Sequence, residues 1–208
     1  RSPAMADAYA SGVTLIYAFD HRHRRPPMDM KDRLGGKGAN LAEMTSIGLP
    51  VPPGFTITTE VCNHYSAHGD YPAGVDVQVE AALTALEADT GKTFGDAADP
   101  LLLSVRSGAR ASMPGIMDTV LNVGLTTKTV HGLALKTKNE RFAQDSYRRF
   151  IGMFGSIVMG VNREHFEDIL KHKKRDLGVT QDTHLDAKAL KELVVSFKEL
   201  VKEETKRD

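Results

Sequence analysis

An apolar run that stops at an arginine is the feature that most limits how this 208-residue chain can fold. Residues 101–105 read Leu-Leu-Leu-Ser-Val, and Arg106 follows them at the start of a serine- and glycine-rich stretch that also holds Arg110. A short run that is apolar on both faces predicts a buried strand in the centre of a sheet. Guanidinium groups and a flexible backbone at a strand end suit a polyphosphate ligand. An exposed loop with two solvated arginines is the competing interpretation.

A second glycine-rich segment could also bind a phosphate group. Residues 35–38 read Gly-Gly-Lys-Gly and directly precede a helical pattern that Gly48 ends. Glycine lets the main chain approach an anion closely, and the start of a helix adds N–H groups and the positive end of its dipole. The common nucleotide-binding loop needs serine or threonine after the lysine, whereas Gly38 stands there. By itself the segment fits a phosphate-binding turn and a plain turn before a helix equally well.

The order of the expected elements predicts a mixed α/β fold followed by a helical part. Strands are expected at 13–19, 55–58 and 101–105, with a helix from Asp76 that ends at Gly91. Residues 118–125 fit a helical turn or a strand. Beyond them only helices are expected, at about 139–159, 163–176 and 187–206. We therefore predict an α/β lobe with a small mixed sheet over residues 1–125 and an all-helical subdomain over 126–208.

Composition excludes several classes of function. Lysine and arginine number 27, as do aspartate and glutamate, so no net field attracts nucleic acid or a membrane surface. No apolar run approaches the ~20 residues that span a bilayer. Cys62 is the only cysteine, which rules out a disulfide within the chain and favours a reducing compartment. We expect Cys62 to pack in the interior, and the protein to be cytoplasmic, with an organelle left open.

Four segments in order carry a resemblance to a known family. They are residues 35–44 (Gly-Gly-Lys-Gly-Ala-Asn-Leu-Ala-Glu-Met), residues 48–60 (Gly-Leu-Pro-Val-Pro-Pro-Gly-Phe-Thr-Ile-Thr-Thr-Glu), the arginine loop at 103–119, and residues 141–150 (Arg-Phe-Ala-Gln-Asp-Ser-Tyr-Arg-Arg-Phe). Together they resemble the start of the pyruvate, phosphate dikinases, over about residues 13–205. The related phosphoenolpyruvate synthases differ, since their arginine motif looks like V-R-S-S-A-x-x-E-D and their lysine motif is usually Gly-Gly-Lys-Asn.

The resemblance implies a fold, a reaction and a set of site residues. It implies the first lobe of an ATP-grasp nucleotide-binding domain and the helical subdomain inserted after it. Enzymes of this family use ATP and inorganic phosphate to phosphorylate a histidine, and a swivelling domain carries that phosphoryl group to pyruvate. By motif position, Lys37 and Arg106 match the family's functional lysine and arginine on the ATP phosphates. The expected ATP-binding residues around them are Gly35, Gly36, Gly38, Ser107, Gly108, Arg110, Ser112 and Gly115.

The resemblance also indicates what this sequence lacks. The phosphohistidine segment, the barrel for pyruvate and the second ATP-grasp lobe, which would supply the Mg²⁺ ligands, are expected elsewhere in a longer, homodimeric enzyme. No metal site is expected among these residues, and the chain alone is expected to be an inactive monomer. The roles of Arg110 and Asp118 and the physiological direction of the reaction stay open. A phosphoenolpyruvate synthase segment and a non-catalytic nucleotide-binding module are the alternatives. We predict that Lys37 and Arg106 face one shared cleft.

Overall fold

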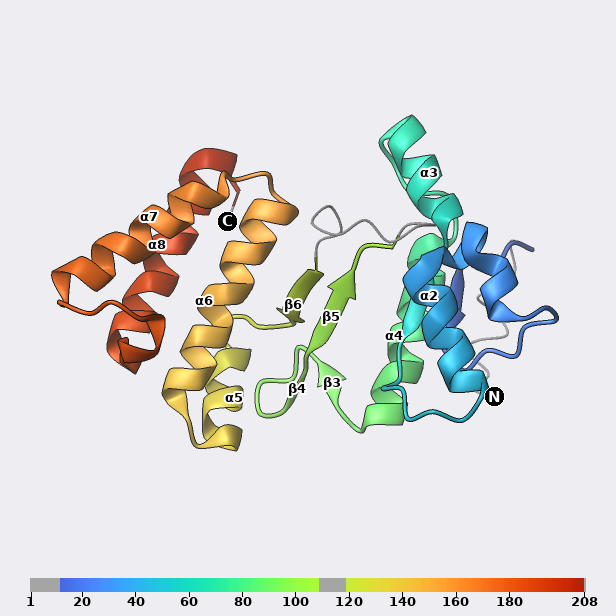
Figure 1. Cartoon of the computed structure of the whole chain (residues 1–208), viewed down its shortest axis with the longest axis horizontal. Helices are drawn as coiled ribbons and strands as arrows, with labels where there is room; N and C mark the ends of the chain where they lie inside the picture. Colours follow the sequence, from blue (N-terminus) through green and yellow to red (C-terminus); the bar gives the residue numbers. More distant parts are fainter. Residues whose placement is uncertain (1–11, 109–118, 208) are drawn as a thin grey trace. The chain divides into compact units, whose positions relative to one another are not determined.

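The computed structural model describes residues 12–108 and 119–207, which form two compact units (Figure 1). The first unit comprises the described residues up to Gly91, together with Ser107 and Gly108. The second comprises Lys92–Arg106 and the described residues from Thr119 onwards. Each unit has its own hydrophobic core, so each is described by itself.

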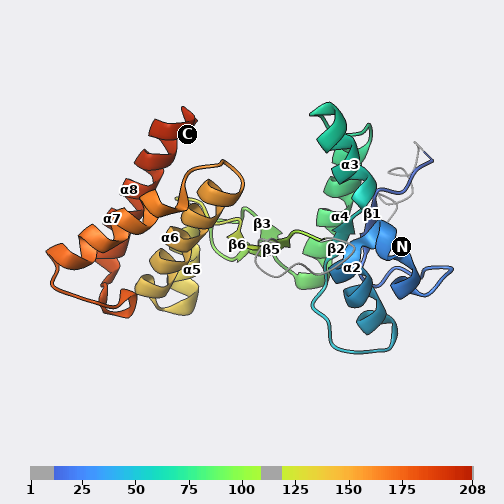
Figure 2. The ribbon, with the colours of Figure 1, turned by 45° about the horizontal axis from the view of Figure 1, so that its top comes forward.

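The first unit combines one pair of strands with helices that pack on it (Figure 2). Its elements are β1 (Ile16–Ala18), η1 (Pro27–Met30), α2 (Lys31–Ser46), β2 (Phe55–Ile57), α3 (Thr59–His68) and α4 (Val75–Thr90). The strands β1 and β2 run antiparallel, with Ile16 opposite Ile57 and Ala18 opposite Phe55. Helix α4 contacts β1, and α2 contacts β2. Through its contact with β2, helix α2, which contains residues 35–38, is held against the strand pair.

The core of the first unit is small and includes a buried amide. Its buried apolar residues are Leu15, Ile16, Val61, Val75 and Ala82. Gln78 of α4 lies among them, and its Oε1 accepts a hydrogen bond from the N–H of Leu15 at 2.7 Å. Its Nε2 donates to the carbonyl of Val13 at 2.9 Å. One side chain thus supplies the hydrogen bonds that a neighbouring strand would otherwise give to residues 13–15.

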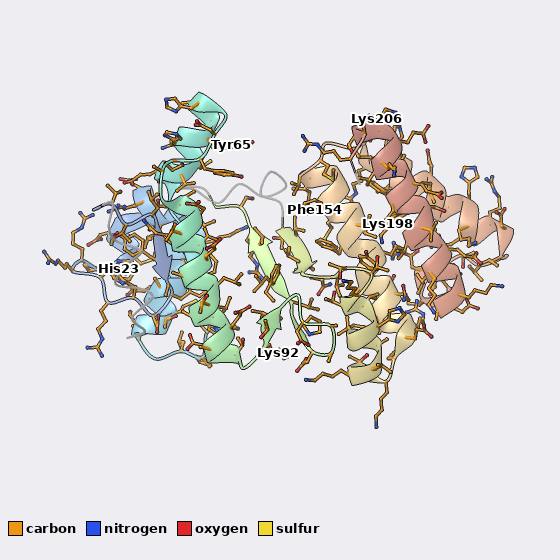
Figure 3. All side chains as sticks on the ribbon, turned by 180° about the vertical axis from the view of Figure 1, so that it is seen from behind. His23, Tyr65, Lys92, Phe154, Lys198 and Lys206 are labelled. Carbon is orange, nitrogen blue, oxygen red and sulfur yellow. The ribbon has the colours of Figure 1, made fainter. Side chains whose placement is uncertain are left out.

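The second unit is a bundle of helices with short strands beside it. Its elements are β3 (Thr93–Phe94), β4 (Pro100–Leu101), β5 (Leu103–Arg106), β6 (Thr119–Val123), α5 (Thr129–Thr137), α6 (Glu140–Ile157), α7 (Arg163–Asp176), η2 (Asp182–His184) and α8 (Ala187–Thr205). The strands pair as β3 with β4, in parallel, and β5 with β6, antiparallel. Helix α6 packs against both α8 and β6. Lys198 of α8, labelled in Figure 3, places its Nζ 4.9 Å from the ring centroid of Tyr147 on α6.

Side-chain caps and close packing explain why the three long helices of this unit form where the sequence predicts them. Asn139, Asn162 and Asp186 each accept a hydrogen bond from the first turn of α6, α7 and α8, respectively. Gly155 lies within α6, where glycine ordinarily costs about 1 kcal/mol. A Cβ at that position would lie 2.7 Å from Cζ of Phe166, so the glycine makes room for an aromatic ring of α7.

The mixed α/β class, the helix that Gly91 ends and the three long helices are confirmed. Residues 119–123 form a strand. The prediction of one central strand over 101–105 is wrong, because the run breaks into β4 and β5, which pair with different strands, and Val105 is 54% exposed. The strands make three two-stranded sheets among the described residues. The division of the chain after residue 125 stays a prediction about the complete domain.

Two further expectations also need correction. Helix α5 was not predicted, although it lies where only helices were expected. Cys62 is exposed, since the neighbouring Val61 occupies the inward face of α3 and one residue along a helix turns the side chain by about 100°. None of the helices that the structure describes is long and apolar enough to cross a membrane.

Candidate functional site

The glycine and lysine segment lies at a break inside α2. Gly35 has φ 69° and ψ 168°, which interrupts the helix between its first turn and the part that begins at Gly36. Residues with a Cβ essentially never adopt this backbone conformation, so only glycine suits the position. Gly36, Lys37 and Gly38 are therefore the first turn of a new helical segment. The prediction that residues 35–38 precede the helix needs correction, because α2 already begins at Lys31 and only Gly35 departs from helical geometry.

This break places a lysine and the start of a helical segment together. The N–H groups in the first turn of a helix lack carbonyl partners within the helix, and the dipole there is positive. Lys37 is half-buried and makes no hydrogen bond or ion pair with any residue that the structure describes. A cation in the first turn is placed unfavourably with respect to the dipole, and a bound anion would reverse that effect. The arrangement suits phosphate oxygens.

Gly38 is fixed by packing. A Cβ there would lie 2.8 Å from Oγ1 and 2.9 Å from Cγ2 of Thr56, which is on β2. The glycine thus lets α2 approach the strand pair closely. Glycine is needed at position 38 because a side chain would collide with Thr56, whereas it is needed at position 35 because of the backbone angles there. The two glycines are therefore needed for different reasons.

The arginine segment begins at the end of β5. Arg106 is the last residue of that strand, pairs with Thr119 of β6 and is exposed. Its side chain makes no hydrogen bond or ion pair with residues 12–108 or 119–207 that the structure records. Ser107 and Gly108 are also exposed, and a Cβ at Gly108 would contact nothing within 4 Å. Arg110, Ser112, Gly115 and Asp118 lie outside the described residues.

Lys37 and Arg106 belong to different compact units. The shared cleft that we predict for them therefore stays a prediction. Each of the two has its charged group at the end of an element, Lys37 at the start of a helical segment and Arg106 at the end of a strand. Arg106 directly precedes Ser107, so the chain passes between the units at this point.

A buried ion network in the second unit accounts for much of the segment at 141–150. Arg148 is only 6% exposed. Its Nη2 donates to Oδ1 of Asp145 at 2.6 Å and to Oδ2 of Asp182 at 3.5 Å. Arg141 donates to the carbonyls of Leu185 and Asp182. Lys174 binds Oδ1 of Asp182 at 2.8 Å. These contacts fasten η2 onto α6 and α7, so the segment has a structural role in the described part of the chain.

The electrostatics of this network favour an ionised Asp182. Burial raises the pKa of its carboxyl, but the hydrogen bond from Lys174 and the charges of Arg148 and Lys174 outweigh burial, so the pKa lies below its ordinary value. Sequence analysis did not identify this network, because Asp182 lies far along the chain from Arg148. Among the described residues, no group of three or more histidine, cysteine, aspartate or glutamate side chains is arranged to hold a metal ion.

Comparison with known proteins bears on the same segment. Residues 31–76, which contain the break at Gly35 and Lys37, match the family described as pyruvate phosphate dikinase, AMP/ATP-binding domain. The chain is 52% identical over 189 residues to the pyruvate, phosphate dikinase of Rhizobium meliloti (strain 1021), a match that covers 90% of this chain and 21% of that protein.

Other relatives give the same result. The pyruvate, phosphate dikinase of Clostridium symbiosum is 55% identical over 189 residues, or 90% of this chain and 21% of that protein. Pyruvate, phosphate dikinase 2 of Oryza sativa subsp. japonica is 57% identical over 169 residues, or 81% of this chain and 19% of that protein. The chain thus spans about a fifth of the length of these relatives. From the four motifs, the geometry at Gly35 and these matches, we conclude that the chain belongs to the pyruvate, phosphate dikinase family.

Proposed function

We propose that this chain binds the phosphates of ATP as part of a pyruvate, phosphate dikinase. The observation that carries the proposal is the break in α2 at Gly35, which starts a new helical segment beside Lys37, whose side chain makes no hydrogen bond or ion pair with the described residues. This turn lies inside the range that matches an AMP/ATP-binding domain. ATP is the anion that best fits both the break at Gly35 beside Lys37 and the match to an AMP/ATP-binding domain.

Each site residue has a distinct proposed task. Lys37 places a compact positive charge on the ATP phosphates, and Arg106 holds the same phosphates with a forked pair of donors. Gly35, Gly36 and Gly38 keep the main chain close to the ligand, and Ser107 and Gly108 continue the contact from the arginine side. Phosphoryl transfer needs positioning and charge neutralisation more than covalent participation of the protein, which these groups supply.

The whole reaction that we propose converts ATP, pyruvate and phosphate into AMP, phosphoenolpyruvate and diphosphate through a phosphohistidine. In this proposal the chain supplies the first lobe of an ATP-grasp domain and its helical subdomain, and the second lobe and the phosphohistidine and pyruvate domains belong to the remainder of such an enzyme, a homodimer. Acidic residues of that second lobe would hold Mg²⁺. The single cysteine supports a reducing compartment, the cytoplasm or an organelle.

Titration of the isotopically labelled chain with ATP tests the binding proposal. We expect the amide resonances of Gly36, Lys37 and Gly38 to shift with weak, saturable affinity, because only part of the site is present. Lys37→Met should reduce the affinity about tenfold, as expected for loss of one charged contact. Lys136→Met, at an exposed lysine of α5, is the matched control and should leave the affinity for ATP unchanged. Absence of shifts at residues 36–38 at saturating ATP would contradict the proposal.

A chimera tests the proposed reaction. Replacing the matching fifth of the Clostridium symbiosum enzyme by this chain should retain formation of phosphoenolpyruvate that depends on inorganic phosphate. Arg106→Ala in the chimera should slow phosphorylation of the carrier histidine at least a hundredfold, the size of loss seen when a donor to a developing charge is removed. Activity that needs no inorganic phosphate would favour a phosphoenolpyruvate synthase, and an unchanged rate would remove Arg106 from the site.

A further inference from the structure

Arg33 lies just before the break at Gly35 and contacts two other elements of the first unit. Its Nη2 donates to the carbonyl of Thr14 at 3.0 Å, and its guanidinium carbon lies 5.5 Å from the ring centroid of Tyr17 on β1. Its Nε lies 3.3 Å from Oε1 of Glu60, and its Nη2 donates to Oε2 of Glu60 at 3.4 Å. One side chain therefore joins the start of α2 to the β1 segment and to α3.

The main chain beside Arg33 is held as well. Oγ1 of Thr59, the first residue of α3, donates to the carbonyl of Asp32 at 2.5 Å. The next residue, Leu34, is buried. We call Arg33, Thr59 and Glu60 the Arg33 clamp. The clamp fixes the chain on the N-terminal side of Gly35, while packing of Gly38 on Thr56 fixes it on the other side.

Gly35 needs such fixing because its own conformation does not select a single geometry. Glycine visits positive and negative φ with similar ease, so the angle between the two parts of α2 depends on what holds each part. A small change there would turn the N–H groups of residues 36–38 and the Lys37 side chain away from a common point. Displacements of about 1 Å are enough to lose much of the benefit of a preorganised site.

We propose that Arg33 is a positioning residue for the phosphate-binding turn: through Glu60, Thr14 and Tyr17 it holds the break at Gly35 so that Lys37 and the amides of residues 36–38 converge on one anion. The inference rests on the proposed function for its ligand, but the conformational part does not depend on ATP. Nothing in the sequence motifs indicates this role, because Glu60 and Thr14 are distant from Arg33 along the chain.

Direct binding of phosphate by Arg33 is the competing role, and the geometry argues against it. The guanidinium already contacts a carbonyl, a carboxylate and an aromatic ring. The carboxylate of Glu60 would repel a phosphate at the same place. The two roles predict opposite results for Glu60→Ala. Loss of the carboxylate loosens a positioning arginine and weakens ATP binding, whereas it releases a phosphate-binding arginine and strengthens ATP binding.

The first experiment examines the chain without ligand. Arg33→Met should shift the amide resonances of residues 35–38 and speed their hydrogen exchange about tenfold, as for a segment that opens locally more often. Global stability should change little, since half-exposed ion pairs contribute little to it. Arg33→Lys keeps the charge opposite Glu60 and should restore part of the effect. Arg163→Met, which removes the exposed Arg163–Glu167 pair of α7, is the matched control.

The second experiment adds ATP. Arg33→Met and Glu60→Ala should each weaken ATP binding by about tenfold, and the double variant should be no weaker than either, because both remove one unit. Unchanged amide resonances and exchange at residues 35–38 in Arg33→Met would overturn the positioning role, whatever the affinity for ATP. Tighter binding in Glu60→Ala would assign Arg33 to the phosphate. Absence of binding by the unaltered chain, with the ligand-free shifts present, would remove the proposed function and leave the positioning role.

Discussion

The two units of this protein are stabilised in different ways. The second unit has a large apolar core and three long helices that begin at side-chain caps, whereas the first has a small core, a buried amide at Gln78 and helices without such caps. In the first unit, single polar side chains such as Gln78 and Arg33 join elements around a small core, whereas in the second unit the polar contacts at Asp182 add to a large apolar core. The comparison teaches that the unit with the proposed phosphate-binding turn depends more on a few specific contacts.

The largest expected effect is in the core of the second unit. Leu190 is fully buried on α8, and Leu190→Ala should lower the free energy of unfolding of this unit by about 3 kcal/mol through lost transfer energy and a cavity. Urea titration followed by methyl resonances of each unit measures the change. Val195→Ala, at a site that is 54% exposed on the same helix, should cost far less. If Leu190→Ala lowered the free energy of unfolding equally in both units, the units would unfold together, and the contrast between their cores would not hold.

The next effect concerns the first unit. Gln78→Leu removes the partners of the Leu15 N–H and the Val13 carbonyl, which should cost about 2 kcal/mol because both become unsatisfied near the core. The same urea titration, read at β1 and α4, measures it. Gln181→Leu, at an exposed residue before η2, is the control and should change little. If Gln78→Leu is neutral, the polar contact is not what holds residues 13–15.

The helix starts offer a smaller and sharper contrast. Asp186 accepts a hydrogen bond from the N–H of Ala189, so Asp186→Ala should cost about 1 kcal/mol. Thr58 stands before α3, but its buried Oγ1 has no hydrogen-bond partner in the described structure. Thr58→Val keeps the shape and should be neutral or stabilising. If Thr58→Val lowered the free energy of unfolding as much as Asp186→Ala, the two units would cap their helices in the same way.

The smallest effect is a difference in response to acid. Burial, and then the nearby His21, lowers the pKa of His23 below 6.5. The unfolded chain therefore binds that proton more readily, and the first unit loses stability as the pH falls from 6.5 towards the folded-state pKa. The depressed pKa of Asp182 stabilises the second unit above pH 3.8, and this is lost as the pH falls through its folded-state pKa.

Substitutions separate these two pH dependences. His23→Gln should remove the change near neutral pH in the first unit, and Asp182→Asn the change at acid pH in the second. Thermal unfolding between pH 3 and pH 8, read from resonances of each unit, measures both. A loss of stability near neutral pH that persists in His23→Gln would exclude His23 as its cause.

The sequence was sufficient for the parts of the fold that local chemistry specifies. The helices that begin after Asn162 and Asp186 were predicted because a cap and a periodic apolar face coincide there, and the helix over 139–159 was predicted from its apolar face alone. Helix α5 was missed, since it has a glycine within it and no side-chain cap. The candidate site residues were predicted from motifs and a resemblance, and the structure adds that Gly35 breaks α2 there. The Arg33 clamp was not found, because its members are separated along the chain.

By itself, the sequence determined the family, the α/β class and the long helices, since caps, periodicity and glycine act over a few residues. Only the tertiary structure decided which glycine serves packing, as Gly38 does on Thr56, and that the run at 101–105 divides into two strands. It also decided that α5 forms, with Gly132 so close to the carbonyl of Ala97 that no Cβ fits. These outcomes depend on contacts between distant residues, which no local pattern encodes.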